Sequence, residues 1–361
     1  MQKLGVAVLG ATGAVGQRFI QLLENHPWFY VAEVIGSSRS AGQPYGEITN
    51  WVLDGSVPDS VANLTVKPLD GQFDSPLLFS ALPKEAAEER EIELAEAGHV
   101  VCTNASVNRM VEDVPLLLPE ANYDHVRLID IQREKRGWKT GAVVANSNCT
   151  AMPVVMALAP LRKFGISKML IVSAQAISGA GYPGVASLDI LDNMIPYVGG
   201  DEQKLETETL RMLGAYDDAH VSWLNAIVSA SCNRVPVVDG HLVNVSITLD
   251  ATPGLDEVIE TWKTFTAPDV VAQLPSAPQH PLYYLPQVDR PQTRRDRNAG
   301  NGMSTSIGRL RECPILGYKF VALSHNTIRG AAGCSILNAE LLAAKGYLGT
   351  FQPEAHLSSV S

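Results

Sequence analysis

Residues 4–26, LGVAVLGATGAVGQRFIQLLENH, decide the fold of the first half of the chain. A short run of small and β-branched residues leads into the turn GATGAVG, and apolar residues on one face of a helix follow. Gly10, Gly13 and Gly16 stand three residues apart in that turn. A strand, a glycine turn and a helix in this order are typical of the first half of a dinucleotide-binding fold.

The glycine turn differs in spacing from the common G-x-G-x-x-G pattern, so a purely structural turn is the alternative. Its context favours a nucleotide. Glycines allow a tight turn and close approach to a pyrophosphate, while the helix that follows offers free N–H groups and the positive end of its dipole.

The end of the second apolar run, VAEVIG at 31–36, bears on the identity of the dinucleotide. An NAD site would place an acidic residue there, but Ser37, Ser38 and Arg39 follow instead. Hydroxyls and a guanidinium suit a 2′-phosphate, which predicts NADP, unless Arg39 is only a solvated loop residue. We expect cofactor contacts from Gly10, Thr12, Gly13, Ala14, Val15, Gly16, Ser37, Ser38, Arg39 and Ser80, where Ser80 ends a third apolar run.

Strands alternate with helical segments up to about residue 148, which predicts an α/β fold with a Rossmann-type, doubly wound parallel sheet. Beyond it, two β-rich runs around Asp239-Gly240 predict antiparallel neighbours in a second, α+β domain with a largely antiparallel or mixed sheet. A last strand and helix should return to the first domain. The predicted domains are 1–148 with 325–361, and 149–324.

Composition excludes several function classes. A net charge of −10 argues against binding to nucleic acid or to an anionic membrane, and no apolar run approaches the ~20 residues of a membrane span. The five scattered cysteines lack metal-ligand spacing, so we expect no metal site and a reducing compartment. The N-terminal apolar run is too short for a signal peptide, which makes the cytoplasm the expected location.

Cys149, in ANSNCT at 145–150, follows a strand and precedes a helix. The N–H groups and dipole of that helix would lower the thiol pKa and favour the reactive thiolate. A buried structural thiol is the alternative, because free cysteines are among the most buried residues.

The motifs around Cys149 decide between these interpretations. NASVNRM (104–110), SNCT (147–150), AQAISGAG (174–181), NRVPVVDGH (233–241) and SHNTIRGAAG (324–333) together closely resemble the aspartate-β-semialdehyde dehydrogenase family. The resemblance covers essentially the whole chain in the family's order. The segment RPQTRRDRNAGNGM (290–303) resembles the branch found in fungi and archaea.

The resemblance implies a role for each matched residue. Cys149 would be the nucleophile, His241 the acid and base, and Gln175 the group that orients the acyl chain. The substrate would be held by Arg109 and Lys204 at its phosphate, by Arg234 at its α-carboxylate, by Asp201 or Glu202 at its α-amine, and by Asn148. Asn326 would lie near the nicotinamide carboxamide, or would cap a helix.

The implied reaction is NADPH-dependent conversion of L-aspartyl 4-phosphate to aspartate 4-semialdehyde through a thioester on Cys149, for threonine, methionine and isoleucine synthesis. Whether it also feeds lysine synthesis is left open by the sequence. A relative that reduces N-acetyl-γ-glutamyl phosphate is one alternative, and a non-catalytic NADP-binding redox sensor is another. The resemblance also implies a homodimer or homotetramer.

Overall fold

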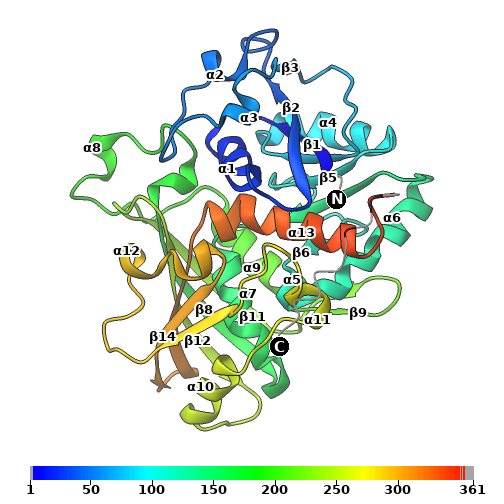
Figure 1. The fold of residues 1–361 in the computed structure, drawn as a ribbon. Coiled ribbons are helices and arrows are strands. Elements are labelled where there is room, and N and C mark those ends of the chain that lie inside the picture. The colour runs from blue at the N-terminus through cyan, green and yellow to red at the C-terminus, as the bar shows by residue number, and fades with distance from the viewer. Residues whose placement is uncertain (1–2, 350, 352, 354–361) are drawn as a thin grey trace, which may run out of the picture.

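Residues 3–349, 351 and 353 are described by the computed structural model, and within them the chain forms two large sheets (Figure 1). The first sheet has the order β3-β2-β1-β4-β5-β7-β6, and every neighbouring pair in it is parallel. Its strands are β1 (Leu4–Leu9), β2 (Phe29–Gly36), β3 (Lys67–Pro68), β4 (Leu77–Ser80), β5 (Val100–Thr103), β6 (Leu116–Leu117) and β7 (Ala142–Asn146).

Helices cover both faces of this parallel sheet. Along β1, Val6 and Val8 pack with the side chains of α1 (Ala14–Leu23) and α13 (Gly333–Ala344), whereas Ala7 and Leu9 pack on the opposite face with Leu94 of α4 (Lys84–Glu96). Burial on both faces explains why the strands are continuously apolar. The remaining helices of this region are α2 (Tyr45–Ile48), α3 (Asp59–Ala62), α5 (Pro119–Asn122), the 3-10 turn η1 (Tyr123–Arg127) and α6 (Leu128–Arg136).

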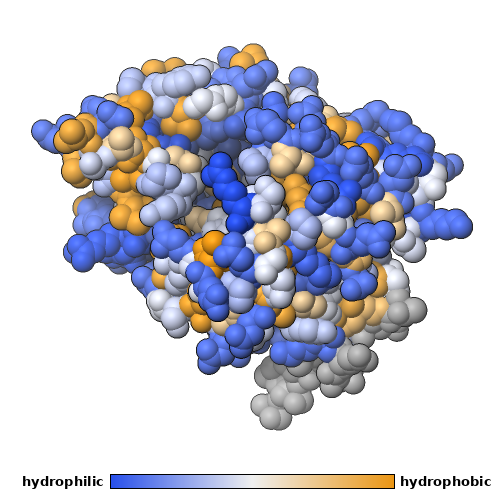
Figure 2. Space-filling view, turned by 90° about the horizontal axis from the view of Figure 1, so that it is seen from above, coloured by the Kyte–Doolittle hydropathy of each residue, from blue (hydrophilic) through white to orange (hydrophobic). Residues whose placement is uncertain are grey.

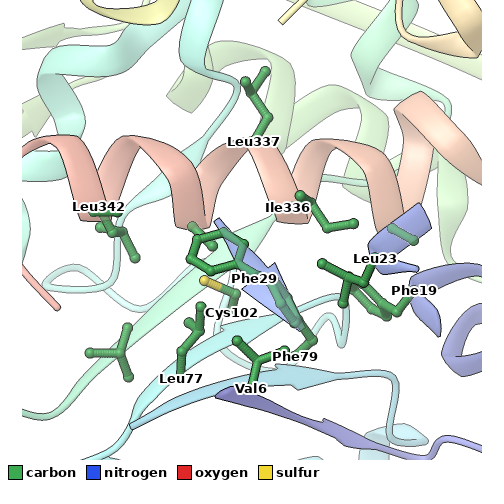
Figure 3. Close-up of a cluster of buried hydrophobic side chains, with 14 of the residues drawn as sticks. Val6, Phe19, Leu23, Phe29, Leu77, Phe79, Cys102, Ile336, Leu337 and Leu342 are labelled. Atoms are coloured by element: carbon green, nitrogen blue, oxygen red, sulfur yellow. The ribbon is translucent and has the colours of Figure 1, made fainter. Parts of the chain in front are cut away.

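The last helix, α13, packs against the parallel sheet, as its contacts with β5 and β7 show. Figure 3 shows Phe19, Phe29 and Phe79 between α13 and the strands, and the rings of Phe19 and Phe79 stack with centroids 4.9 Å apart. The domain limits expected from the sequence stay a prediction, and residues 1–2, 350, 352 and 354–361 of the predicted first domain lie outside the described residues.

The second sheet is mixed, with the order β11-β8-β12-β15-β14-β13. Its strands are β8 (Ile166–Gln175), β11 (Ile227–Arg234), β12 (His241–Leu249), β13 (Leu282–Leu285), β14 (Thr305–Cys313) and β15 (Gly317–Ser324). Three helices, α7 (Ala151–Leu158), α9 (Asp201–Met212) and α10 (Leu255–Lys263), share one hydrophobic core with one face of this sheet. The architecture confirms the predicted fold class, a Rossmann-type parallel sheet followed by a domain with a mixed sheet.

The two β-rich runs around Asp239-Gly240 are not neighbours, and this expectation was wrong. Strand β8 lies between them, parallel to β11 and antiparallel to β12. The backbone N–H groups of Ile177 and Ser178 donate to the carbonyls of Val237 and Val238, so the connection packs over the end of β8 instead of forming a tight hairpin. Such pairing between distant segments leaves no local signal in the sequence.

Shorter elements complete the described part of the chain. They are the 3-10 turns η2 (Ala159–Phe164), η3 (Ile177–Ala180) and η4 (Ala299–Gly302), the helices α8 (Ser187–Ile190), α11 (Asp269–Ala272) and α12 (Thr293–Asp296), and the strand pair β9 (Ala215–Tyr216) and β10 (Val221–Ser222). None of the helices within the described residues has the length and apolar character that crossing a bilayer requires.

Two crossings connect the sheets. The first runs from β7 through Cys149 into α7, and the second from β15 through the π-helix η5 (Ile328–Ala332) into α13. Arg329 of η5 makes two hydrogen bonds, of 2.7 and 2.8 Å, to the carboxylate of Glu120, and neither side chain is exposed. Loss of one partner of such a buried pair typically costs about 3–5 kcal/mol, so this pair fixes the second crossing firmly.

Candidate active site

A cavity of about 490 Å³ lies where the ends of the two sheets face each other. Its walls come from the segments that follow β1, β2, β5 and β7 in the parallel sheet, and from those that follow β8, β11 and β15 in the mixed sheet. Ligands of parallel α/β sheets bind at this edge, beyond the carboxyl ends of the strands. The predicted site residues that line the cavity are Ala14, Val15, Arg109, Asn148, Cys149, Asp201, Lys204 and Asn326.

The glycine turn has the geometry of an anion site. Gly10 has a φ of 73°, and a Cβ atom there would lie 2.7 Å from the carbonyl oxygen of Ala81. A Cβ atom at Gly16 would collide with the carbonyl oxygen of Gly10. Helix α1 begins after Gly13 with no side-chain cap, and Ala14 and Val15 of its first turn line the cavity. These residues therefore fit a dinucleotide pyrophosphate.

The other expected cofactor residues lie at strand ends. Ser37, Ser38 and Arg39 follow β2 and are exposed, which leaves the Arg39 guanidinium accessible to a phosphate. Thr12 lies within the turn, where its carbonyl oxygen accepts a hydrogen bond from Gln17. Ser80 ends β4 but is fully buried, and its hydroxyl donates to Glu91 at 2.6 Å. Any cofactor contact of Ser80 would therefore involve its backbone.

The environment of Cys149 differs from the expectation of a lowered thiol pKa. The side chain lines the cavity between β7 and α7, but the surrounding protein desolvates the thiolate and raises the pKa of Cys149 to about 11. The carboxylate of Asp201 raises the pKa further, while the charges of Arg109 and Arg234 oppose the shift. In the pKa of Cys149, the effect of burial therefore outweighs the opposite effect of the N–H groups and dipole at the start of α7.

Helix α9 presents charged side chains to the cavity. Lys204 donates to Asp201 with an Nζ–Oδ1 distance of 2.9 Å, and both line the cavity. Glu202 points elsewhere, because its Oε1 accepts the backbone N–H of Cys232 in β11 at 3.0 Å. The geometry thus favours Asp201 over Glu202 as the carboxylate that a bound ligand would meet.

His241, Gln175 and Arg234 lie behind the cavity wall rather than in it. All three are buried, and Gly179, which lines the cavity, lies over two of them. A Cβ atom at Gly179 would be 2.8 Å from Nη1 of Arg234 and 2.9 Å from Nε2 of His241. The amide of Gln175 donates to the hydroxyl of Ser173 at 3.4 Å. A glycine is required at 179 for a ligand to approach the imidazole and the guanidinium.

The backbone of Ala176 holds both the imidazole of His241 and the guanidinium of Arg234. Its N–H donates to Nδ1 of His241 at 3.1 Å, and its carbonyl accepts from Nη1 of Arg234 at 2.7 Å. Because Nδ1 is an acceptor, the neutral imidazole carries its proton on Nε2, which has no partner among the described residues. Burial, and then the charge of Arg234, lowers the pKa of His241 to about 3, so the ring is neutral.

Asn326, at the start of the second crossing, is bonded to the segment before β12 and to the turn η3 that follows β8. Its Oδ1 accepts the N–H of Gly240 at 2.8 Å, and its Nδ2 donates to the hydroxyl of Ser178 at 2.7 Å. Neither bond caps the helix that follows, so the capping alternative was wrong. Asn326 also lines the cavity, where its amide can meet a ligand.

Gly330 and Glu208 are residues of this site that, like Gly179, were not expected from the sequence. Gly330 packs against Cys149, since a Cβ atom there would lie 2.6 Å from the Cβ of Cys149. Glu208, which is 1% exposed, accepts hydrogen bonds from Arg109 and from the backbone N–H of Asn148. Glu208 follows Asp201 by seven residues and Lys204 by four, a spacing that places all three on one helix face and could have revealed it.

Comparison with known proteins agrees with this arrangement. Residues 5–129 match the model of the semialdehyde dehydrogenase NAD binding domain, and residues 158–329 match that of the semialdehyde dehydrogenase dimerisation domain. An aspartate-semialdehyde dehydrogenase of Archaeoglobus fulgidus is 46% identical over 341 residues, which cover 94% of this chain and 98% of that protein. The chain belongs to the aspartate-semialdehyde dehydrogenase family.

Fungal members of the family are similarly close. The aspartate-semialdehyde dehydrogenase of Schizosaccharomyces pombe is 43% identical, with 95% of this chain and 99% of that protein covered. The crystal structure of the Candida albicans family member with NADP superimposes with a TM-score of 0.88 at 38% identity, covering 95% of this chain and 99% of that one. Both agree with the resemblance to the fungal and archaeal branch.

The raised pKa of Cys149 is directly testable. With a pKa of about 11, we expect alkylation of Cys149 by iodoacetamide to keep rising with pH well beyond the usual thiol range. Asp201→Asn removes a carboxylate that raises this pKa, so the midpoint should move to lower pH. Mass spectrometry of the Cys149 peptide separates this thiol from the other four.

Glu202→Gln is the matched control for this titration, because the carboxylate of Glu202 is bonded to the N–H of Cys232 instead of facing the cavity. It should leave the midpoint unchanged. A wild-type midpoint at or below the pKa of an ordinary thiol would contradict the environment described for Cys149.

Proposed function

We propose that the protein catalyses the NADPH-dependent reductive dephosphorylation of L-aspartyl 4-phosphate to L-aspartate 4-semialdehyde. The observation that carries the proposal is one cavity that gathers a cysteine, cations on two sides and the carboxylate of Asp201, in a chain 46% identical to a family member. The substrate carries a phosphate, a carboxylate and an ammonium group, and each finds a partner of opposite charge in the cavity or directly behind its wall.

The charges of the cavity suggest how this substrate is held. Arg109 and Lys204 line the same cavity as Cys149, and their charges suit the phosphate. Arg234, behind Gly179, suits the planar α-carboxylate, and Asp201 suits the ammonium. A substrate with an acylated amine would offer Asp201 no ammonium group to bind, which argues against N-acetyl-γ-glutamyl phosphate.

The chemistry follows from the positions of Cys149 and His241. The thiolate of Cys149 attacks the acyl carbon, the bond from that carbon to the phosphate oxygen breaks, and phosphate leaves with the bonding electrons. The resulting thioester is reduced to a thiohemiacetal, which collapses to the aldehyde and frees the thiolate. Both stages place negative charge on the former carbonyl oxygen, and the Nε2–H of His241 is the buried donor that can stabilise it.

We further propose NADP as the cofactor, on the strength of the Candida albicans relative described with NADP and of the fit of the glycine turn. When bound, it supplies the hydride that reduces the thioester. The start of α1 would hold the pyrophosphate, Arg39 with Ser37 and Ser38 the 2′-phosphate, and Asn326 the carboxamide side.

The activity itself can be measured in reverse. Aspartate semialdehyde, phosphate and NADP⁺ should together produce NADPH absorbance, and Cys149→Ala should lower the rate by more than about 10³-fold because the covalent step is lost. N-acetyl-glutamate semialdehyde should give no comparable rate. A folded, cofactor-binding protein without activity would overturn the proposal, and so would an undiminished Cys149→Ala variant, as the redox-sensor alternative requires.

Arg39 should determine the preference for NADP. Arg39→Ala removes a charge-assisted contact to the 2′-phosphate, so we expect the KM for NADP⁺ to rise about tenfold or more while the KM for NAD⁺ stays unchanged. Arg127→Ala, which removes an exposed arginine on η1, is the control and should change neither. Equal effects of Arg39→Ala on both cofactors would contradict this assignment.

We also propose that two copies pair through the second domain, which matches a dimerisation domain. The face of the mixed sheet opposite its helices is open, and Leu170, Val172 and Ile227 are exposed on β8 and β11. Apolar residues also gather at the left of Figure 2, where α8 lies in Figure 1. Exposed apolar faces of this kind mark interfaces.

Light scattering at micromolar concentration should therefore give about twice the chain mass of 38.8 kDa, or four times if dimers pair again. Leu170→Asp should shift the protein toward the monomer, because a carboxylate would be buried between the sheets. Tyr30→Asp, exposed on β2 of the parallel sheet, should not. A wild-type monomer would refute this assembly.

A further inference from the structure

Glu208 contacts both Arg109 and the loop that carries Cys149, two parts of the site that would act on the same substrate. Its Oε1 accepts a hydrogen bond from Nη1 of Arg109 at 3.1 Å. Its Oε2 accepts the backbone N–H of Asn148 at 2.6 Å and the hydroxyl of Ser147 at 3.1 Å. One buried carboxylate therefore joins the guanidinium proposed for the phosphate to the loop that carries Cys149.

We propose that Glu208 is a positioning residue that sets the distance between the phosphate-holding Arg109 and the nucleophile Cys149. This inference rests on the proposed function and extends it to a residue that itself touches neither substrate nor cofactor. Glu208 acts from α9, a helix of the second domain, on two loops that follow β5 and β7 of the parallel sheet.

A carboxylate is the side chain that this position requires. The donors converge on Glu208 from two loops, and a carboxylate can accept on both oxygens at once. A glutamine has the same length but only one oxygen, so its NH₂ group would face either Arg109 or the N–H of Asn148, both of which are donors. Glu208→Gln therefore releases one of the two loops whichever way the amide turns.

The backbone near Arg109 is held independently of Glu208. Arg211, one turn further along α9, donates to the carbonyl oxygens of Arg109, Val111 and Val114. Nη2 of Arg109 also donates to the carbonyl of Asn104 at 2.7 Å. Glu208→Gln should thus leave the loop folded and change only where the guanidinium and the Cys149 loop lie relative to each other.

Misplacement of reacting groups by about 1 Å costs on the order of 10²-fold in rate. We therefore expect Glu208→Gln to lower kcat in the reverse assay by about 10- to 100-fold and to raise the KM for phosphate. Its affinity for NADP⁺, measured by fluorescence titration, should match that of the wild type. Rates are normalised to active sites by titration of Cys149, so that partial unfolding cannot imitate the effect.

Three further variants sharpen the test. Ser147→Ala removes one donor to Oε2 and should lower kcat by about 3- to 10-fold even if Glu208→Gln folds poorly. Glu206→Gln, on the same helix but bonded to the N–H of Ala230, should match the wild type. In an Arg109→Met background, Glu208→Gln should change the phosphate KM no further, because Glu208 acts on phosphate through Arg109.

The outcomes separate this inference from the proposed function. If the wild type shows no activity with aspartate semialdehyde, the proposed function fails. If the wild type is active but kcat and phosphate KM of the folded Glu208→Gln and Ser147→Ala variants stay within twofold of it, the positioning role of Glu208 is refuted. The positioning role is also refuted if Glu208→Gln raises the phosphate KM in the Arg109→Met background by as much as it does in the wild type.

Discussion

The close packing of Gly330 against Cys149 is the constraint on which the arrangement of the site depends. The two crossings between the sheets meet at this point, and any Cβ atom at 330 would lie 2.6 Å from that of Cys149. The π-helix that carries Gly330 is held by the fully buried ion pair of Arg329 and Glu120. A single extra residue in a helix, as a π-helix provides, is common at functional sites because it reorients the groups beside it.

Buried carboxylates hold the loops around the cavity in place. Glu91 accepts hydrogen bonds from Ser80, Thr103 and Asn108, so it ties the ends of β4 and β5 to the loop that leads to Arg109. Glu208 does the same for Arg109 and the Cys149 loop from the opposite side. Loops lack the regular backbone hydrogen bonds of strands and helices. A buried carboxylate that accepts from several donors takes their place, and it does so only when every donor is present.

The sequence predicted those parts of the fold that depend on local pattern. The glycine turn, the alternating strands and helices and the mixed second sheet are all present, since periodicity and turn chemistry encode them. The neighbours of β11 and β12 were predicted wrongly because β8, far away in sequence, inserts between them. In the site, chemical type and motif indicated Cys149 and its cations, but the thiol pKa and the choice of Asp201 depend on burial and direction, which only the assembled structure supplies.

The backbone of one residue, Ala176, couples two properties that a designer would want to vary separately. Its N–H determines where the proton of the His241 ring lies, and its carbonyl anchors the Arg234 guanidinium. Moving Arg234 outward to admit a longer dicarboxylic acyl chain would mean shifting the backbone at Ala176, which would also displace the N–H group that orients the imidazole. Chain-length tolerance in this scaffold is therefore limited by backbone at the end of β8, and side-chain replacement within the cavity alone would not widen it.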